Sequence, residues 1–231
     1  DSPIGRLAAT LKPGDWAEIE TVLPKGMTSL FDLFRVRIDD GRFMSIDGWT
    51  DSAHWDPRRR QTLFIGMRKY KRFIAYDSMN NAWQVLGWAG NAPPKFERVG
   101  HVYGRTALDW KRGHYYWLGP GKVLYRYLLD EARWESIDGV LMGGYVPMEM
   151  HEGMDALLAI NRGGQLIGYR DGKSWEIGRV AVDGYHSVGR YNRARGDMLF
   201  AGGNASARKL VLVSKDGSTR SLRDAPFDIV I

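Results

Sequence analysis

The sequence of 231 residues contains no cysteine. Disulfide bonds, thiolate metal ligands and cysteine nucleophiles are therefore excluded, but the compartment stays open because a domain of this size folds without disulfides. No apolar run approaches the roughly 20 residues that span a bilayer, so membrane insertion is not expected. Phosphate-binding G-x-x-x-x-G-K-[ST] loops, H-E-x-x-H helices and G-x-S-x-G nucleophile elbows are also absent. Neither a metal nor a cofactor is predicted.

What the sequence does contain is typical of a turn-rich β protein. It has 28 glycines and 12% aromatic residues, which serve turns with positive φ and half-buried strand faces respectively. A net charge of +6 favours an anionic partner. The basic residues are dispersed along the chain, so nucleic acid is not the partner we expect.

A strand–turn–strand phrase recurs along the chain. Its first copy is RFIAYDSMNNAWQVLG at Arg72–Gly87, and the later copies are Val123–Ile137, Gln165–Ile177 and Lys209–Leu222. A repeat spacing of roughly 40–50 residues, built of strands alone, is typical of the blades of a β-propeller.

The repeat predicts an all-β fold: a β-propeller of four-stranded antiparallel blades, with about four complete blades in a single domain or fragment spanning 1–231. The predicted blades cover residues 45–88, 97–138, 145–178 and 184–223. We interpret residues 16–21 as an N-terminal strand that closes the ring, and residues 224–231 as the start of a further, incomplete blade. One or two helical turns are expected near residues 4–11, and a strand is a candidate at 30–38.

The aromatic phrases also resemble those of Kelch-like propeller proteins. Each of the first three repeats pairs a tyrosine with a tryptophan, and Gly202-Gly203 keeps the Kelch glycine pair in the fourth blade. The aromatic pairs are Tyr76 with Trp83, Tyr127 with Trp134, and Tyr169 with Trp175. This resemblance covers residues 45–222 and implies a fold rather than an activity.

A second phrase, H-x-x-G-R, occurs at His101–Arg105 and again at His186–Arg190. Both copies are predicted where an innermost strand begins, and His54 and His151 are interpreted as occupying the matching place in the other two blades. If the strand is extended, His101, Tyr103 and Arg105 share one face by regular alternation.

Three interpretations of this pattern remain open. The histidines either hydrogen-bond neighbouring blades, bind a ligand, or take part in catalysis as in some propeller-fold polysaccharide lyases, where Arg or His neutralises a uronate and His or Tyr removes a proton. The candidate catalytic residues are His101, Tyr103 and Arg105. The candidate ligand-binding residues are His54, His151, His186, Arg190, Tyr145 and Tyr185.

The favoured function is an extracellular-type binding or assembly module that recognises an anionic glycan or a protein partner through its loop face. The alternatives are a polysaccharide lyase acting on a uronate-containing glycan, and a structural component of a larger assembly such as a virion. An extracellular, secreted or virion-associated location is expected, with possible assembly through an open C-terminal edge.

Overall fold

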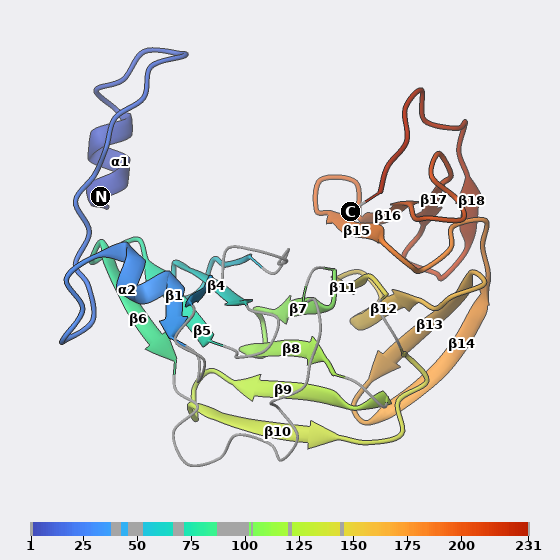
Figure 1. The fold of residues 1–231 in the computed structure, drawn as a ribbon. Helices are drawn as coiled ribbons and strands as arrows, with labels where there is room; N and C mark the ends of the chain where they lie inside the picture. Colours follow the sequence, from blue (N-terminus) through green and yellow to red (C-terminus); the bar gives the residue numbers. More distant parts are fainter. Residues whose placement is uncertain are drawn as a thin grey trace. The chain divides into compact units, whose positions relative to one another are not determined.

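A computed structural model describes residues 2–37, 43–45, 53–66, 72–86, 102, 104–119, 122–143 and 146–230. The chain divides into two compact units, unit 1 from Asp1 to Gly100 and unit 2 from His101 to Ile231. Figure 1 shows the elements of each unit coloured along the sequence. The two units are described separately below.

Unit 1 contains two short helices, a two-stranded sheet and one four-stranded sheet, which we call blade 1. The helices and the small sheet are α1 (Pro3–Ala8), α2 (Leu30–Phe34), β1 (Arg35–Arg37) and β2 (Phe43–Ser45). Blade 1 consists of β3 (His54–Asp56), β4 (Gln61–Gly66), β5 (Arg72–Asp77) and β6 (Ala82–Leu86). Its strands pair antiparallel in chain order.

Unit 2 contains three further sheets of the same kind. Blade 2 consists of β7 (Thr106–Asp109), β8 (His114–Leu118), β9 (Leu124–Leu128) and β10 (Arg133–Ile137). Blade 3 consists of β11 (Met148–His151), β12 (Ala156–Ile160), β13 (Gln165–Arg170) and β14 (Lys173–Arg179). Blade 4 consists of β15 (Ser187–Asn192), β16 (Asp197–Gly202), β17 (Leu210–Val213) and β18 (Thr219–Ser221). Four antiparallel four-stranded meanders confirm the predicted all-β propeller architecture.

The second strand of blade 3 explains how the core of unit 2 is built. All five residues of β12 are buried, and alternate ones enter different clusters. Leu157 and Ala159 pack with residues of blade 2, whereas Ala156, Leu158 and Ile160 pack with residues of blade 4. Because side chains alternate across a strand, a continuous apolar run such as ALLAI is buried on both faces.

The repeated aromatic pair has the same structure in blades 1 and 2. Tyr76 lies directly opposite Trp83 with ring centroids 4.9 Å apart, and Tyr127 lies opposite Trp134 with centroids 5.1 Å apart. In blade 3 the strands are joined by the two-residue turn Asp171-Gly172, which changes the register. Trp175 therefore lies opposite Gly168, and Tyr169 lies opposite Ser174. The tyrosine and tryptophan of the repeat therefore lie directly opposite each other in blades 1 and 2 and are displaced by one residue in blade 3.

The predicted strand at 30–38 is wrong in its first half. Residues 30–34 form α2, because Ser29 and Asp32 make a capping box: Asp32 Oδ2 accepts from Ser29 N at 3.0 Å, and Asp32 N donates to Ser29 Oγ at 3.3 Å. Arg72 Nη1 then donates to the carbonyls of Asp32 and Leu33, each at 2.7 Å. The S-x-x-D spacing was the sequence signal for this helix.

The predicted closing strand at 16–21 is not formed. Trp16 is 80% exposed, and the segment instead ends beside the outermost strand of blade 1 through a parallel bridge between Val22 and Ala82. Trp83 Nε1 also donates to Thr21 Oγ1 at 3.1 Å. The predicted strand does not form, and this segment meets blade 1 through the bridge at Val22.

The C-terminal segment forms no strand in residues 222–230, so the predicted first strand of a further blade is also wrong. The segment returns along the loop between β16 and β17, where Ile229 N donates to Ala207 O at 2.7 Å and Gly203 N donates to Ile229 O at 2.9 Å. Ion pairs from Arg208 to Asp228 at 2.7 Å and from Lys209 to Asp224 at 2.8 Å fix it there.

Candidate functional site

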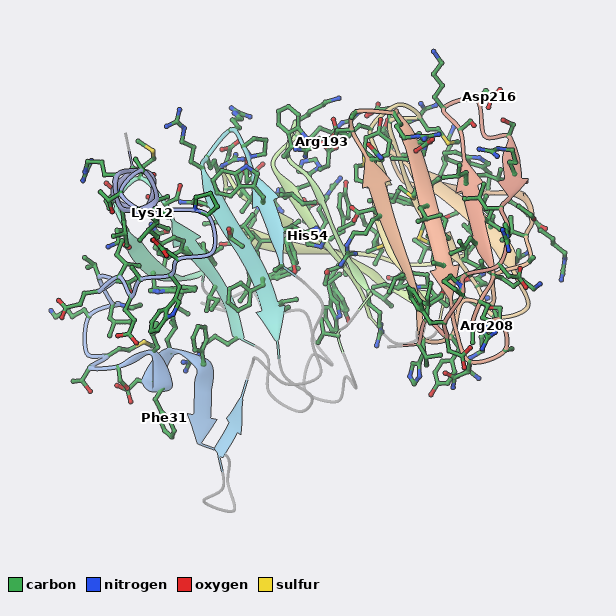
Figure 2. The ribbon with its side chains drawn as sticks, turned by 90° about the horizontal axis from the view of Figure 1, so that it is seen from above. Lys12, Phe31, His54, Arg193, Arg208 and Asp216 are labelled. Carbon is green, nitrogen blue, oxygen red and sulfur yellow. The ribbon has the colours of Figure 1, made fainter. Side chains whose placement is uncertain are left out.

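Each meander in unit 2 has two chemically different ends. We call the end with the first and third turns of each blade the hairpin end, and the end with the second turns and the connections between blades the loop end. Figure 2 shows Arg193 and Asp216 at the hairpin end of blade 4 and Arg208 at its loop end. Of the described candidates, His151 lies at the hairpin end, and Tyr185 and His186 lie at the loop end.

The first turn of every blade begins with a side chain that caps the turn. Asp56, Asp109 and Asn192 each accept from two backbone N–H groups through Oδ1. The residue four places later has a positive φ in every case; these residues are Arg60, Gly113, Asp155 and Gly196. This shared turn gives a common register for comparing the four blades.

His151 takes the place of the capping Asp or Asn in blade 3. Its Nδ1 accepts from Met154 N at 3.2 Å, and its Nε2 lies 3.2 Å from Val213 O in blade 4. Burial lowers the pKa of this imidazole, and a neutral ring with a proton on Nε2 satisfies both contacts. The structural interpretation of the histidines, a hydrogen bond to a neighbouring blade, is confirmed for His151.

In the common register the described histidines do not occupy one position. His151 is the turn residue itself, His54 lies at the start of β3 and is opposite Leu63, and His186 precedes β15. The prediction of one matching place is therefore wrong for these three residues. His54 lies two residues before the turn residue Asp56, His151 is the turn residue itself, and His186 lies six residues before the turn residue Asn192.

The two H-x-x-G-R phrases are likewise out of register. Arg190 lies within β15 and is exposed, whereas Arg105 precedes β7 and is only 2% exposed. Gly104 has a φ of +69° and Arg105 N donates to Val102 O at 3.1 Å, so the backbone turns there and is not extended. His101, Tyr103 and Tyr145 lie outside the described residues, and their roles stay predictions.

Two of the predicted ligand-binding residues meet at the loop end of blades 3 and 4. The rings of Tyr185 and His186 are stacked, with centroids 4.0 Å apart and an interplanar angle of 21°. The guanidinium carbon of Arg162 lies 4.1 Å from the centroid of the Tyr185 ring. Two planar groups cannot both lie this close over one face, so the tyrosine is the middle layer of a three-layer stack, which we call the loop-end stack.

A network of backbone contacts holds this stack in place. Asp183 Oδ2 accepts from Gly163 N at 2.8 Å, and its Oδ1 accepts from Tyr185 N at 2.9 Å. Asp183 N in turn donates to Ser206 Oγ at 2.7 Å. These bonds join the turn that carries Arg162 to the connection that carries Tyr185 and His186, so the layers stand on a rigid support.

His186 has a φ of +61°, a left-handed conformation that costs a residue with a Cβ roughly 1–3 kcal/mol. The support formed by Asp183 and by the bond from Asn204 N to Tyr185 O at 3.0 Å offsets that cost. Strained residues of this kind concentrate at binding sites, where they fix an orientation that relaxed backbone does not give.

Arg190 lies within strand β15. Its Nη1 donates to Gly189 O at 2.8 Å and lies 3.7 Å from Glu149 Oε2 of blade 3. It therefore bridges the innermost strands of blades 3 and 4.

The structure also brings together a histidine, a tyrosine and an arginine that sequence reasoning did not single out. On blade 2, His114 Nδ1 lies 3.3 Å from the hydroxyl of Tyr116, and Arg126 lies opposite Tyr116 on the next strand. Burial raises the pKa of Tyr116 and, with Arg126 nearby, lowers that of His114. Alternation along β8 and pairing with β9 are the signals that could have found this group.

At the hairpin end, Glu152 joins the first turns of all three blades of unit 2. It accepts from Trp110 Nε1 at 3.1 Å and from Arg193 Nε at 2.6 Å through Oε1, and its Oε2 lies 3.3 Å from Lys111 Nζ. Partial burial opposes its ionisation, but these donors together outweigh burial and hold the pKa of the Glu152 carboxyl below its ordinary value. We call the contacts of Glu152 with Trp110, Lys111 and Arg193 the clasp, because they link blades 2, 3 and 4.

Glu152→Ala is expected to lower the free energy of unfolding by about 1–2 kcal/mol at pH 7, because a largely buried carboxylate that accepts from two neighbouring blades is lost, although its partners Lys111 and Arg193 are half exposed. Glu131→Ala is the matched control, since Glu131 pairs with Arg133 at 2.6 Å but is 55% exposed, and it should change stability by less than about 0.5 kcal/mol. Urea denaturation of both variants measures the difference. An equal effect of the two substitutions would remove the clasp interpretation.

The effect of Glu152 should also depend on pH. Its folded pKa is depressed, so its contribution is fully present above the unfolded glutamate pKa of about 4.3 and disappears as pH falls through the lower folded value. The gap between wild type and Glu152→Ala should therefore close in strongly acidic buffer.

Among the described residues, no group of three or more His, Asp or Glu side chains could hold a metal ion. No helix in this part of the chain is both long enough and apolar enough to cross a membrane.

Comparison with solved structures shows the fold. A structural genomics protein of unknown function from Bacteroides thetaiotaomicron matches with a TM-score of 0.55 and 12% identity, over 81% of this chain and 51% of that one. A streptogramin B lyase matches with a TM-score of 0.55 and 14% identity, over 81% of this chain and 60% of that one. The chain thus spans 51% and 60% of the length of these two proteins. At such identity the likeness establishes the β-propeller fold alone.

No protein-family model matches the chain, and no curated protein matches it in sequence.

Proposed function

We propose that this chain is a binding module that recognises a glycan through the loop end of blades 3 and 4. The observation that carries the proposal is the loop-end stack, in which Tyr185 is covered by Arg162 at 4.1 Å and by His186 at 4.0 Å. A sugar ring has an apolar C–H face and a rim of hydroxyls. Planar side chains with polar edges, held on a rigid support, match both features.

The support in unit 2 favours binding with little rearrangement. Asp183, Gly163 and Ser206 fix the two segments that carry the stack, so the ordering cost of these side chains is met before the ligand arrives. Recognition of a glycan would place the protein outside the cell or on a virion, and we propose that location with the function. The aromatic pairs of blades 1 and 2 support a Kelch-like repeat within the same proposal.

Tyr185→Ala is expected to weaken glycan binding at least about tenfold, because loss of the middle layer releases both flanking groups. Tyr185→Phe keeps the ring and should bind nearly as well as wild type. Trp16→Ala removes an aromatic residue that is 80% exposed in unit 1 and serves as the matched control. Binding to a plate-bound panel of neutral and acidic polysaccharides measures all three variants.

The proposal fails if no polysaccharide of the panel binds, or if binding survives Tyr185→Ala unchanged. Thermal unfolding of the alanine variant, followed by circular dichroism, separates loss of binding from loss of fold.

A polysaccharide lyase is the second candidate. His114 and Tyr116 are of the residue types that can remove a proton, and Arg126 is of the type that neutralises a carboxylate. The three lie together on blade 2, where Arg126 is paired with Glu135. Incubation with uronate-containing polysaccharides, followed by the absorbance of an unsaturated product, tests this candidate. Appearance of the product would favour catalysis over binding alone.

A further inference from the structure

The cations of blades 3 and 4 differ in how they are neutralised. Arg208 and Lys209 at the loop end pair with Asp228 and Asp224, at 2.7 and 2.8 Å. Arg162 and Arg179 have no carboxylate within 4 Å among the residues that the structure describes. Arg162 is held by the tyrosine ring, and Arg179 Nη1 lies 3.4 Å from Gly163 O.

Asp183 is the carboxylate of this network, and among the described residues it forms no ion pair with Arg162. Oδ1 and Oδ2 each accept from a backbone N–H, of Tyr185 and Gly163 respectively. The guanidinium of Arg162 is thus oriented by stacking on Tyr185 while its N–H edge stays available to a ligand. An arginine held in this way loses little conformational entropy when it binds.

We infer that the glycan recognised at the loop-end stack carries a carboxylate, and that Arg162 is its anchor. This inference rests on the proposed function and names the class of sugar that it takes. The planar fork of a guanidinium matches the two oxygens of a carboxylate in two parallel hydrogen bonds, which a neutral hydroxyl cannot form. Arg179, whose Nη1 donates to Gly163 O at 3.4 Å, adds a second positive charge that suits a polymer with repeated acidic groups.

The ligand test uses polygalacturonate and the same polymer with its carboxylates methyl-esterified. The two share the sugar ring and its linkage and differ in charge, so the comparison isolates the carboxylate. Wild type is expected to bind the acidic form at least about tenfold tighter, which corresponds to one bidentate charge-assisted pair. Dextran sulfate forms a third arm, because it carries charge without a planar carboxylate.

The variant test uses Arg162→Met and Arg162→Lys against Arg208→Met as control. Arg208→Met removes the same charge at the same end, but from an arginine already paired with Asp228 at 2.7 Å. Arg162→Met should abolish the preference for the acidic polymer, and Arg162→Lys should lose most of it because an ammonium has no fork. Arg208→Met should keep the wild-type preference.

Each result has a defined meaning. Equal binding of the acidic and esterified polymers, with dependence on Tyr185, overturns the carboxylate inference and keeps the proposed glycan function. Binding of dextran sulfate as tight as that of polygalacturonate, or equal losses in Arg162→Met and Arg208→Met, overturns it in favour of unspecific charge attraction. Absence of binding to all three polymers and to the neutral panel overturns the function and the inference together.

Discussion

Gly184→Ala is expected to lower the free energy of unfolding of unit 2 by about 3 kcal/mol or more. A Cβ at this position would lie 1.8 Å from Ile160 O and 2.8 Å from Asn161 C, and both are backbone atoms that cannot turn away. Relief would require the connection between blades 3 and 4 to move off the end of β12. That connection carries Tyr185 and His186, so the loop-end stack should be displaced as well.

Gly178→Ala is the matched control for this prediction. Gly178 lies in β14, has no unusual φ, and a Cβ there would meet no atom within 4 Å. Alanine should be neutral or slightly stabilising, by up to about 1 kcal/mol, because it restricts the unfolded chain. Chemical denaturation monitored by tryptophan fluorescence measures both variants. Comparable stability of Gly184→Ala and Gly178→Ala would show that the connection does not approach β12 so closely.

Phe200→Ala should cost about 3–5 kcal/mol, the range for removing a large aromatic side chain from a core. Phe200 is fully buried in the cluster that joins blades 3 and 4, together with Leu158 and Val211. Its ring occupies the space that Gly189 leaves open, since a Cβ at Gly189 would lie 2.6 Å from the Phe200 ring. No neighbouring side chain can fill a cavity of that size without moving a strand.

Phe227→Ala provides the control for the core substitution. Phe227 is 65% exposed in the C-terminal segment, so its removal should change stability by less than about 0.5 kcal/mol. Thermal or urea unfolding of the two variants gives the comparison. A small effect of Phe200→Ala would contradict the packing of blade 3 on blade 4 that defines the core.

The strands were predictable because their signals are local. Alternating or continuous apolar runs, separated by turn residues, place β12, β15 and β17 within a residue or two of their observed bounds. The two-residue turn Asp171-Gly172 was equally readable, since both residues have the positive φ that a type I′ turn requires.

Segments without strand neighbours were predicted less well. Residues 16–21 and 224–231 contain phrases that resemble blade strands, yet a strand forms only where another backbone offers hydrogen bonds. Val22 finds a single parallel bridge to Ala82, and Ile229 bonds to a loop. Pairing partners far along the chain are not encoded in a local phrase.

The candidate site also combines features that local sequence predicts with features that depend on tertiary structure. Sequence determined that the chain is an all-β propeller without thiol chemistry, and it selected Tyr185 and His186 among the candidates. The turn residue that sets the register of each blade showed that His54, His151 and His186 hold different positions, which the repeated letters alone did not reveal. Only the tertiary structure placed Arg162, from the turn between β12 and β13, against Tyr185 from the connection between β14 and β15. The physical reason is that stacking depends on how two loops of neighbouring blades meet, and that geometry is set by the packing of the sheets beneath them.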